Sequence, residues 1–179
     1  MNKQTNEKIL LLDMDGVLAM LYAVTNFLKA MWDKGVFRDL KPYKRMLAAI
    51  KKFIKMHPDV KVYILSACIS EQCMKEKHEW LNEHLPEIPA ENRILIMTGE
   101  SKAEAAKKLV GELNQEVFLL DDHTPNLNGW VAAGGSGIKA RNEINCNNNN
   151  KSKSWKGNKV SCFGRVDEIV EDLEDIIFG

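Results

Sequence analysis

Near its start the chain reads Ile9-Leu10-Leu11-Leu12-Asp13-Met14-Asp15-Gly16-Val17-Leu18, an apolar run that ends at two aspartates. Four consecutive aliphatic residues are typical of a parallel strand that is covered on both faces. Such a strand would project Asp13 and Asp15 into the crevice at its carboxyl end. Two carboxylates held this close together repel each other unless a cation lies between them or one keeps a proton. The stretch therefore predicts a buried strand that leads into a charged site.

The length and composition indicate one globular domain, with room for a small inserted lobe. The chain has 179 residues, of which 45% are hydrophobic, and its formal net charge is zero. Neutral charge gives no support for a broad nucleic-acid-binding surface, so we expect nucleic acid not to be a partner. The polar N-terminus lacks the apolar core of a signal peptide, and no apolar run is long enough for a membrane span. Four cysteines without metal-type spacing fit a reduced, cytoplasmic protein.

Apolar runs and helical periodicity alternate along the chain, which predicts a doubly wound α/β fold with a mainly parallel sheet. Strands are expected at residues 8–13, 60–65, 93–97, 116–121, 137–140 and 160–163. Helical patterns cover residues 17–34, 46–54, 70–85, 101–113 and 166–177. The stretch 141–158, which includes four consecutive asparagines at 147–150, is polar and is expected to form a surface loop.

Polar residues follow several of the predicted strands. Asp121 and Asp122 follow the strand at 116–121, Ser66 follows the strand at 60–65, and Lys102 lies where a helix begins. In doubly wound sheets, ligands bind at the carboxyl ends of the strands. Four carboxylates gathered at that edge would suit a hard cation, and we expect Mg²⁺. The sequence thus predicts a magnesium site formed by Asp13, Asp15 and the later acidic pair.

These residue types match the chemistry of phosphate-ester hydrolysis. A cation would neutralise both a carboxylate and the phosphate that it attacks, so that an aspartyl-phosphate can form and then be cleaved by water. A second carboxylate two residues on can protonate the leaving oxygen and then deprotonate the water. Ser66 can donate a hydrogen bond to a phosphoryl oxygen, and Lys102 can add positive charge. We expect a Mg²⁺-dependent phosphomonoesterase.

The order of these motifs resembles that of the haloacid dehalogenase superfamily of phosphatases. The resemblance rests on Asp13-Met14-Asp15-Gly16-Val17-Leu18, then Ser66, then Lys102, then Asp121-Asp122, and covers residues 8 to 125. It implies that Asp13 is the nucleophile and Asp15 the general acid/base, which also offers its backbone carbonyl to Mg²⁺. Ser66 and Lys102 would bind phosphate. It also implies a Rossmann-like core at 1–16 and 60–179, with a small helical cap inserted at 17–59.

A narrower resemblance is to the 5′(3′)-deoxyribonucleotidase-like branch, on the Asp13–Ala19 start and on Leu119-Leu120-Asp121-Asp122-His123-Thr124-Pro125-Asn126. It implies a nucleoside monophosphate as the small phosphorylated substrate. Tyr22, Trp32 and Phe37 lie in the expected cap, where they would stack on a base or pack against the core. The oligomeric state is left open.

Other functions fit parts of the pattern. A phosphatase for a sugar phosphate or a nucleic-acid end would use the same carboxylates, and a non-catalytic nucleotide-binding protein would keep the same fold. A phosphorylated receiver domain also uses Asp, Ser or Thr, and Lys, but it places its acidic pair after the first strand. In this chain the pair at Asp121-Asp122 comes late, which disfavours a receiver.

Overall fold

The computed structural model describes residues 7–146 and 155–179, which form a parallel sheet between two layers of helices. Its strands are β1 (Ile9–Leu12), β2 (Lys61–Cys68), β3 (Arg93–Met97), β4 (Val117–Asp121), β5 (Ser136–Arg141) and β6 (Asn158–Ser161). Its longer helices are α2 (Lys44–Met56), α3 (Glu71–His84), α4 (Lys102–Val110), α5 (Thr124–Ala132) and α7 (Val166–Phe178). Short helical pieces are η1 (Leu21–Ala23), α1 (Phe27–Ala30), η2 (Ala90–Asn92) and α6 (Glu143–Cys146). The predicted α/β class with a doubly wound sheet is confirmed.

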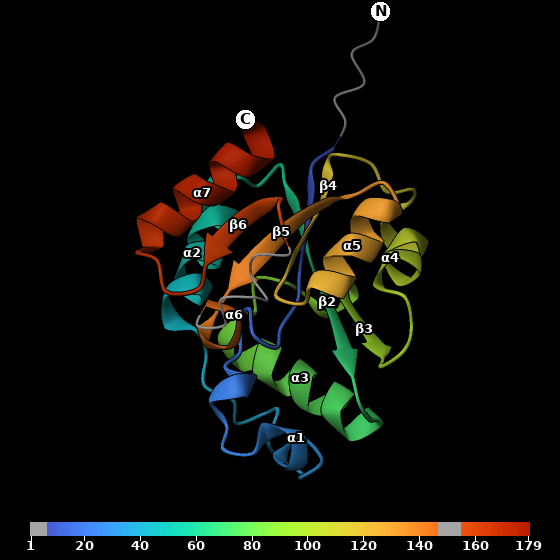
Figure 1. Cartoon of the computed structure of the whole chain (residues 1–179), viewed down its shortest axis with the longest axis vertical. Helices are drawn as coiled ribbons and strands as arrows, with labels where there is room; N and C mark the ends of the chain where they lie inside the picture. The colour runs from blue at the N-terminus through green and yellow to red at the C-terminus, as the bar shows by residue number, and fades with distance from the viewer. Residues whose placement is uncertain (1–6, 147–154) are drawn as a thin grey trace, which may run out of the picture.

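The sheet has the strand order β3-β2-β1-β4-β5-β6, and every pairing is parallel. The chain moves outward from β1 to β3 and then returns to place β4 on the other side of β1. This reversal creates a switch point between β1 and β4, where the connections diverge to opposite faces of the sheet, the usual place for a ligand site in such folds. In Figure 1 the arrowheads point toward the end of the molecule that carries α1, while both termini lie at the opposite end.

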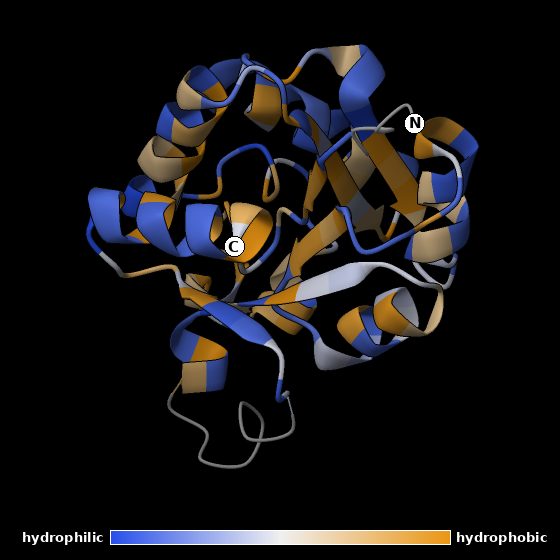
Figure 2. Cartoon of the chain, turned by 90° about the horizontal axis from the view of Figure 1, so that it is seen from above, coloured by the Kyte–Doolittle hydropathy of each residue, from blue (hydrophilic) through white to orange (hydrophobic). Residues whose placement is uncertain are grey.

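Each face of the sheet packs against its own helices, because side chains alternate along a strand. Leu10 and Leu12 belong to a core cluster with residues of α2, α3 and α7, whereas Ile9 and Leu11 belong to a second cluster with residues of α4 and α5. All four side chains are buried. Figure 2 shows the apolar strands between the helices. This double burial explains why β1 reads as an unbroken apolar run.

The helix expected over residues 17–34 does not form as one element. The segment instead contains η1 and the four-residue α1, separated by Asn26 in a left-handed conformation with φ of 52°. Backbone pairing explains the difference: Met20 N donates to Lys41 O (2.8 Å), and Tyr43 N donates to Leu18 O (2.9 Å). Backbone groups of residues 18–20 thus pair with the distant segment 41–43, which interrupts the helical pattern.

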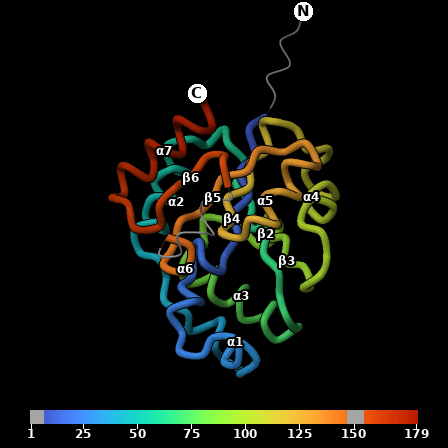
Figure 3. The backbone as a smooth tube through the Cα atoms, in the orientation of Figure 1, coloured from blue at the N-terminus to red at the C-terminus, as the bar shows by residue number. Residues whose placement is uncertain are grey.

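Residues between β1 and α2 extend beyond the carboxyl edge of the sheet, beside α3 (Figure 3). Helix α2, in contrast, packs against α7 along one face of the sheet. The division of the chain into a core and a cap stays a prediction. The structure supports a shorter projecting segment, from Val17 to Tyr43, than the expected cap of residues 17–59.

Two smaller expectations concern the region after β5. The stretch 141–158, expected to be a loop, contains α6 and the start of β6. The four asparagines at 147–150 lie outside the described residues. Among the described residues, no helix is long and apolar enough to cross a membrane.

Candidate active site

Three carboxylates converge at the switch point of the sheet. Asp13 follows β1, Asp121 ends β4, and Asp122 comes directly after it. One oxygen from each lies within 4.8 Å of the others. Asp121 is fully buried, and Asp13 and Asp122 are each 7% exposed. The neighbouring strands β1 and β4, which pair in register from Ile9↔Val117 to Leu12↔Leu120, therefore bring together residues more than 100 positions apart.

Lys102 supplies positive charge beside these carboxylates. It is the first residue of α4, whose N-cap Ser101 accepts a hydrogen bond from Glu104 N (3.3 Å). Its Nζ lies 3.0 Å from Asp13 Oδ2 and 2.6 Å from Asp121 Oδ2. Burial alone would lower the pKa of Lys102, but the charges of Asp13 and Asp121 outweigh it and raise the pKa. Lys102 is therefore a cation at neutral pH, close to the carboxylate predicted to attack phosphate.

The three carboxylates differ in how readily they ionise. Burial raises the pKa of Asp13, but the charges of Lys102 and Lys77 more than compensate and hold that pKa below its ordinary value. Burial, followed by the charges of Asp13 and Asp121, raises the pKa of Asp122 to about 7. Burial also raises the pKa of Asp121. Repulsion among these carboxylates therefore opposes the ionisation of Asp121 and Asp122, and a bound cation would relieve it.

A divalent cation with a preference for oxygen fits this donor set. Oxygens bound to one octahedral Mg²⁺ at about 2.1 Å are about 3 Å apart when adjacent and about 4.2 Å apart when opposite. The spread of at most 4.8 Å among the oxygens of Asp13, Asp121 and Asp122 needs only small side-chain movements to meet that geometry. We therefore assign these three aspartates as candidate metal ligands.

Asp15 points to a different partner, Lys77, which the sequence analysis did not single out. Lys77 Nζ donates to Asp15 Oδ2 (2.7 Å), Ser66 Oγ (2.9 Å) and Ala67 O (2.7 Å). Burial raises the pKa of Asp15 above its ordinary value even though the charge of Lys77 opposes that rise. A signal for Lys77 was present in the sequence, because a lysine falls among Cys73, Trp80 and Leu81 on the apolar stripe of a predicted helix.

Two asparagines for which no role was predicted hold the later acidic pair in place. Asn142 Nδ2 donates to Asp122 Oδ2 (2.8 Å) and to Gly16 O (2.8 Å), and the side chain is fully buried. Asn126 Nδ2 donates to Asp121 Oδ2 (3.0 Å). Asn142 comes from the stretch 141–158, which is predicted to be a surface loop. The polar composition of that stretch gives no sign that this asparagine is buried and holds Asp122. These amides orient carboxylates in the way that outer partners orient metal ligands.

Gly16 fits tightly beneath these groups. Its φ is +74°, and an added Cβ would lie 2.4 Å from Asp122 Oδ2, 2.6 Å from Tyr22 Cε2 and 2.7 Å from Asn142 Nδ2. A side chain at this position would therefore both strain the backbone and displace a candidate metal ligand.

We expect Gly16→Ala to destabilise the protein by about 2–4 kcal/mol, from the left-handed backbone and the close contacts. Urea unfolding measures the change. Gly129→Ala is the matched control, because an added Cβ at this helical position of α5 meets nothing within 4 Å. The control should be neutral or up to about 1 kcal/mol more stable. Equal stability of the two variants would contradict the described packing.

The three aromatic residues expected near the substrate occupy different environments. Tyr22 hydrogen-bonds to Asp122, and burial followed by the charge of Asp122 raises the pKa of its hydroxyl. Phe37 is buried against Lys77, whose Nζ lies 5.2 Å from the ring centroid. Trp32 is 69% exposed on the projecting segment. The structure brings Tyr22 and Phe37 to the site and leaves Trp32 at the surface.

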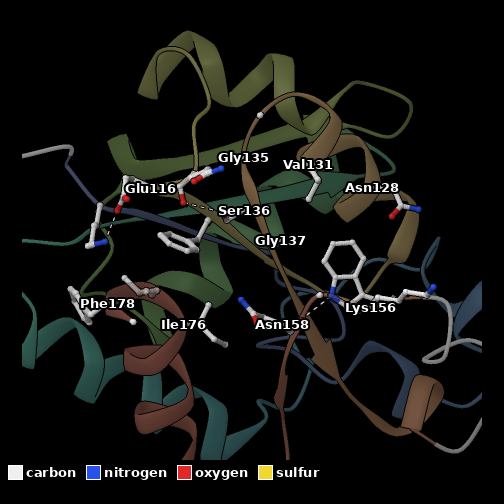
Figure 4. Close-up of a pocket in the computed structure, with 18 residues that line it drawn as sticks. Glu116, Asn128, Val131, Gly135, Ser136, Gly137, Lys156, Asn158, Ile176 and Phe178 are labelled. Atoms are coloured by element: carbon white, nitrogen blue, oxygen red, sulfur yellow. Dashed lines mark hydrogen bonds and ion pairs between the residues drawn. The ribbon is translucent and has the colours of Figure 1, made fainter.

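A cavity of about 980 Å³ lies elsewhere, at the amino ends of the strands (Figure 4). Its lining includes Lys8, Glu116, Ser136 and Asn158, which begin or precede β1, β4, β5 and β6. It is therefore separated from the acidic cluster by the length of the sheet. The cluster itself is closed, since Asp13, Lys102 and Asp122 are each at most 8% exposed.

Comparison with solved structures identifies the fold. A D,D-heptose 1,7-bisphosphate phosphatase from B. bronchiseptica, complexed with magnesium and phosphate, has a TM-score of 0.64 at 14% identity, over 94% of this chain and 98% of that one. A haloacid dehalogenase hydrolase of family IA, variant 3, from Entamoeba histolytica has a TM-score of 0.60 at 16% identity, over 96% and 100% of the two chains. At these identities the likeness shows the fold, which is that of the haloacid dehalogenase hydrolases.

Comparison of the sequence with protein families gives a narrower match. Residues 24–161 match the family described as 5′ nucleotidase, deoxy (Pyrimidine), cytosolic type C protein. The curated protein sequences contain no significant match to this chain. The family match covers Ser66, Lys102 and the acidic pair of β4, and it begins after the first two aspartates.

Proposed function

We propose that this chain hydrolyses nucleoside monophosphates and that deoxyribonucleotides are its preferred substrates. The proposal follows from its family, because the chain belongs to the 5′ nucleotidase, deoxy (Pyrimidine), cytosolic type C family. The wider resemblance to haloacid dehalogenase phosphatases, described above, is confirmed at the level of the fold. The observation that carries the proposal is the convergence of Asp13, Asp121 and Asp122 with Lys102 at one switch point. We also propose a cytoplasmic location, which the family description supports.

Asp13 is the proposed nucleophile. Its lowered pKa keeps the carboxylate ionised, and a carboxylate can attack phosphorus to give an aspartyl-phosphate that water then cleaves. Lys102, which contacts Asp13, would offset the negative charge that gathers on the phosphoryl oxygens. Mg²⁺ held by Asp13, Asp121 and Asp122, with the backbone carbonyl of Asp15, would supply charge neutralisation and alignment of the phosphate.

Asp15 is the proposed general acid and base. Its raised pKa favours a retained proton, which the leaving oxygen of the ester would accept. After that transfer the carboxylate would take a proton from the attacking water. Ser66, whose Oγ is fixed by Lys77, would donate its own proton to a phosphoryl oxygen. Asp13 would thus be the nucleophile of the first half of the reaction, and Asp15 would transfer a proton in each half.

Substrate entry requires movement of the segments around the site, because its charged groups are almost entirely buried. We propose that the segment from Val17 to Tyr43 acts as the cap, since it lies at the carboxyl edge of the sheet (Figure 1). Tyr22 and Phe37 would then line the substrate side of the cap. A cap that closes excludes water and strengthens the interactions of the phosphate with Lys102.

A phosphate-release screen with Mg²⁺ tests the proposal. It compares deoxynucleoside and ribonucleoside monophosphates, sugar phosphates, 5′-phosphorylated oligonucleotides and p-nitrophenyl phosphate. We expect the highest kcat/KM with a deoxynucleoside monophosphate. Activity on sugar phosphates alone would keep the phosphatase and remove the nucleotidase, while binding of nucleotides without release of phosphate would favour a non-catalytic protein.

A further inference from the structure

Lys77 is a fully buried lysine whose hydrogen-bonding capacity is completely used. Burying an ammonium group costs several kcal/mol unless hydrogen bonds and an opposite charge compensate. Its three protons go to Asp15 Oδ2, Ser66 Oγ and Ala67 O at 2.7–2.9 Å. The acidic partner in this set is the proposed acid/base, which contacts Lys77 and not Lys102. Packing alone would not require a buried charge here, so the arrangement indicates that Lys77 acts on Asp15.

The helix that carries Lys77 also holds the projecting segment. Glu76 accepts hydrogen bonds from Gly35 N (2.6 Å) and Phe37 N (3.1 Å), and Trp80 Nε1 donates to Leu40 O (2.7 Å). The Lys77 Nζ also lies over the ring of Phe37, 5.2 Å from its centroid, which is a cation–π contact. In Figure 3 this segment lies beside α3. One helix thus fixes both the segment and the lysine beneath it.

The contacts of Asp15 are one-sided. Its Oδ2 bonds to Lys77, whereas its Oδ1 is buried and has no hydrogen-bond partner among the described residues. A buried carboxylate oxygen left without a partner costs free energy, and a hydrogen bond to a ligand would recover that cost. Lys77 holds the carboxylate in the orientation that directs Oδ1 away from the protein's own donors.

We propose that Lys77 is a positioning residue, which locks Oδ2 of Asp15 so that Oδ1 faces the leaving oxygen of the substrate. Phe37 covers Lys77 from the segment between β1 and α2, so the position of that segment sets how firmly Asp15 is held. This inference rests on the proposed phosphatase function, and it places the main effect of Lys77 on the departure of the alcohol, the step in which Asp15 protonates the leaving oxygen.

The test compares Lys77→Met with the wild type on two substrates. The substitution keeps the length of the side chain and removes the charge. With a deoxynucleoside monophosphate, whose leaving alkoxide needs a proton, we expect kcat to fall about 30-fold or more, with KM within about threefold. With p-nitrophenyl phosphate, whose phenolate leaves without a proton, the fall should be at least about tenfold smaller, and what remains would come from the proton transfer from water that both substrates share. Lys75→Met, an exposed position on the same helix, should change neither.

A double-mutant cycle adds a second readout. If Lys77 acts through Asp15, Lys77→Met should have little further effect on kcat in an Asp15→Asn background. Equal losses on both substrates, or multiplicative losses in the cycle, would assign Lys77 a general structural role and overturn the proposal. A wild type that releases no phosphate from either substrate would instead overturn the proposed function.

Two further measurements do not depend on these outcomes. Phe37→Leu keeps the buried apolar contact and removes the aromatic ring, so it should reduce kcat with the nucleotide more than with p-nitrophenyl phosphate, by less than Lys77→Met does. This variant provides the test if Lys77→Met fails to fold. The crystal structure of Lys77→Met should show Asp15 turned from its present orientation while Asp13, Asp121 and Asp122 stay in place. An unmoved Asp15 would overturn the proposal whether or not the protein is active.

Discussion

Replacing Asp13 with asparagine should lower kcat for phosphate release by at least about 1000-fold, because no other residue can replace an attacking carboxylate. The amide that replaces it is a poor nucleophile and a weaker ligand for a divalent cation. Lys102 keeps its second partner, since its Nζ also lies 2.6 Å from Asp121 Oδ2. The variant should therefore fold, and phosphate release with the best substrate of the screen measures the loss.

Asp33→Asn is the matched control, since it makes the same change at an exposed position of the projecting segment. It should retain wild-type kcat. Circular dichroism and thermal melting of both variants would show that the loss at position 13 is not a folding defect. If Asp13→Asn keeps more than about a tenth of the wild-type rate, Asp13 is not the nucleophile.

Removing divalent cations should have an effect of similar size. EDTA should reduce phosphate release to background, and excess Mg²⁺ should restore it, because three crowded carboxylates repel an anionic substrate unless a cation neutralises them. Burial and the charges of Asp13 and Asp121 already disfavour ionisation of Asp122. A cation bound between these groups would offset that repulsion.

A binding measurement separates metal loss from other effects of EDTA. Mg²⁺ should raise the melting temperature of the wild type, because a ligand that binds only the folded state stabilises it. The rise should vanish in the double variant Asp121→Asn/Asp122→Asn. Activity that is indifferent to chelation, or an equal Mg²⁺ effect on the double variant, would contradict the assignment of these aspartates.

The strands and the acidic cluster were accessible from the sequence because they depend on local patterns. The run Ile9–Leu12 is apolar on both faces, and a parallel strand with helices on both sides requires that composition. The rule that strand ends meet at one edge then placed Asp13 beside Asp121 and Asp122. The helices predicted over 70–85 and 101–113 begin close to those positions, where the side chains of Ser70 and Ser101 accept hydrogen bonds as N-caps.

The remaining features depend on contacts between segments that are distant in the sequence. The 17–34 segment has helical spacing, but the pairing of Ala19 with Pro42 overrides it. Asn142 resembles an ordinary polar residue in the sequence, and the helical pattern shows at most that Lys77 is buried. Only the folded arrangement gives Lys77 and Asn142 their partners, Asp15 and Asp122. Periodicity shows which face a residue occupies, but not which residue lies opposite.

The position of β1 in the middle of the sheet has a consequence for synthesis of the chain. Its neighbours are β2, which ends at Cys68, and β4, which ends at Asp121. A nascent chain that has not yet emerged beyond residue 121 has one side of its central strand unpaired, with the apolar run Ile9–Leu12 exposed there. Because domains fold as units and exposed strand edges promote association, translational pausing before that point should favour aggregation of the ribosome-bound chain.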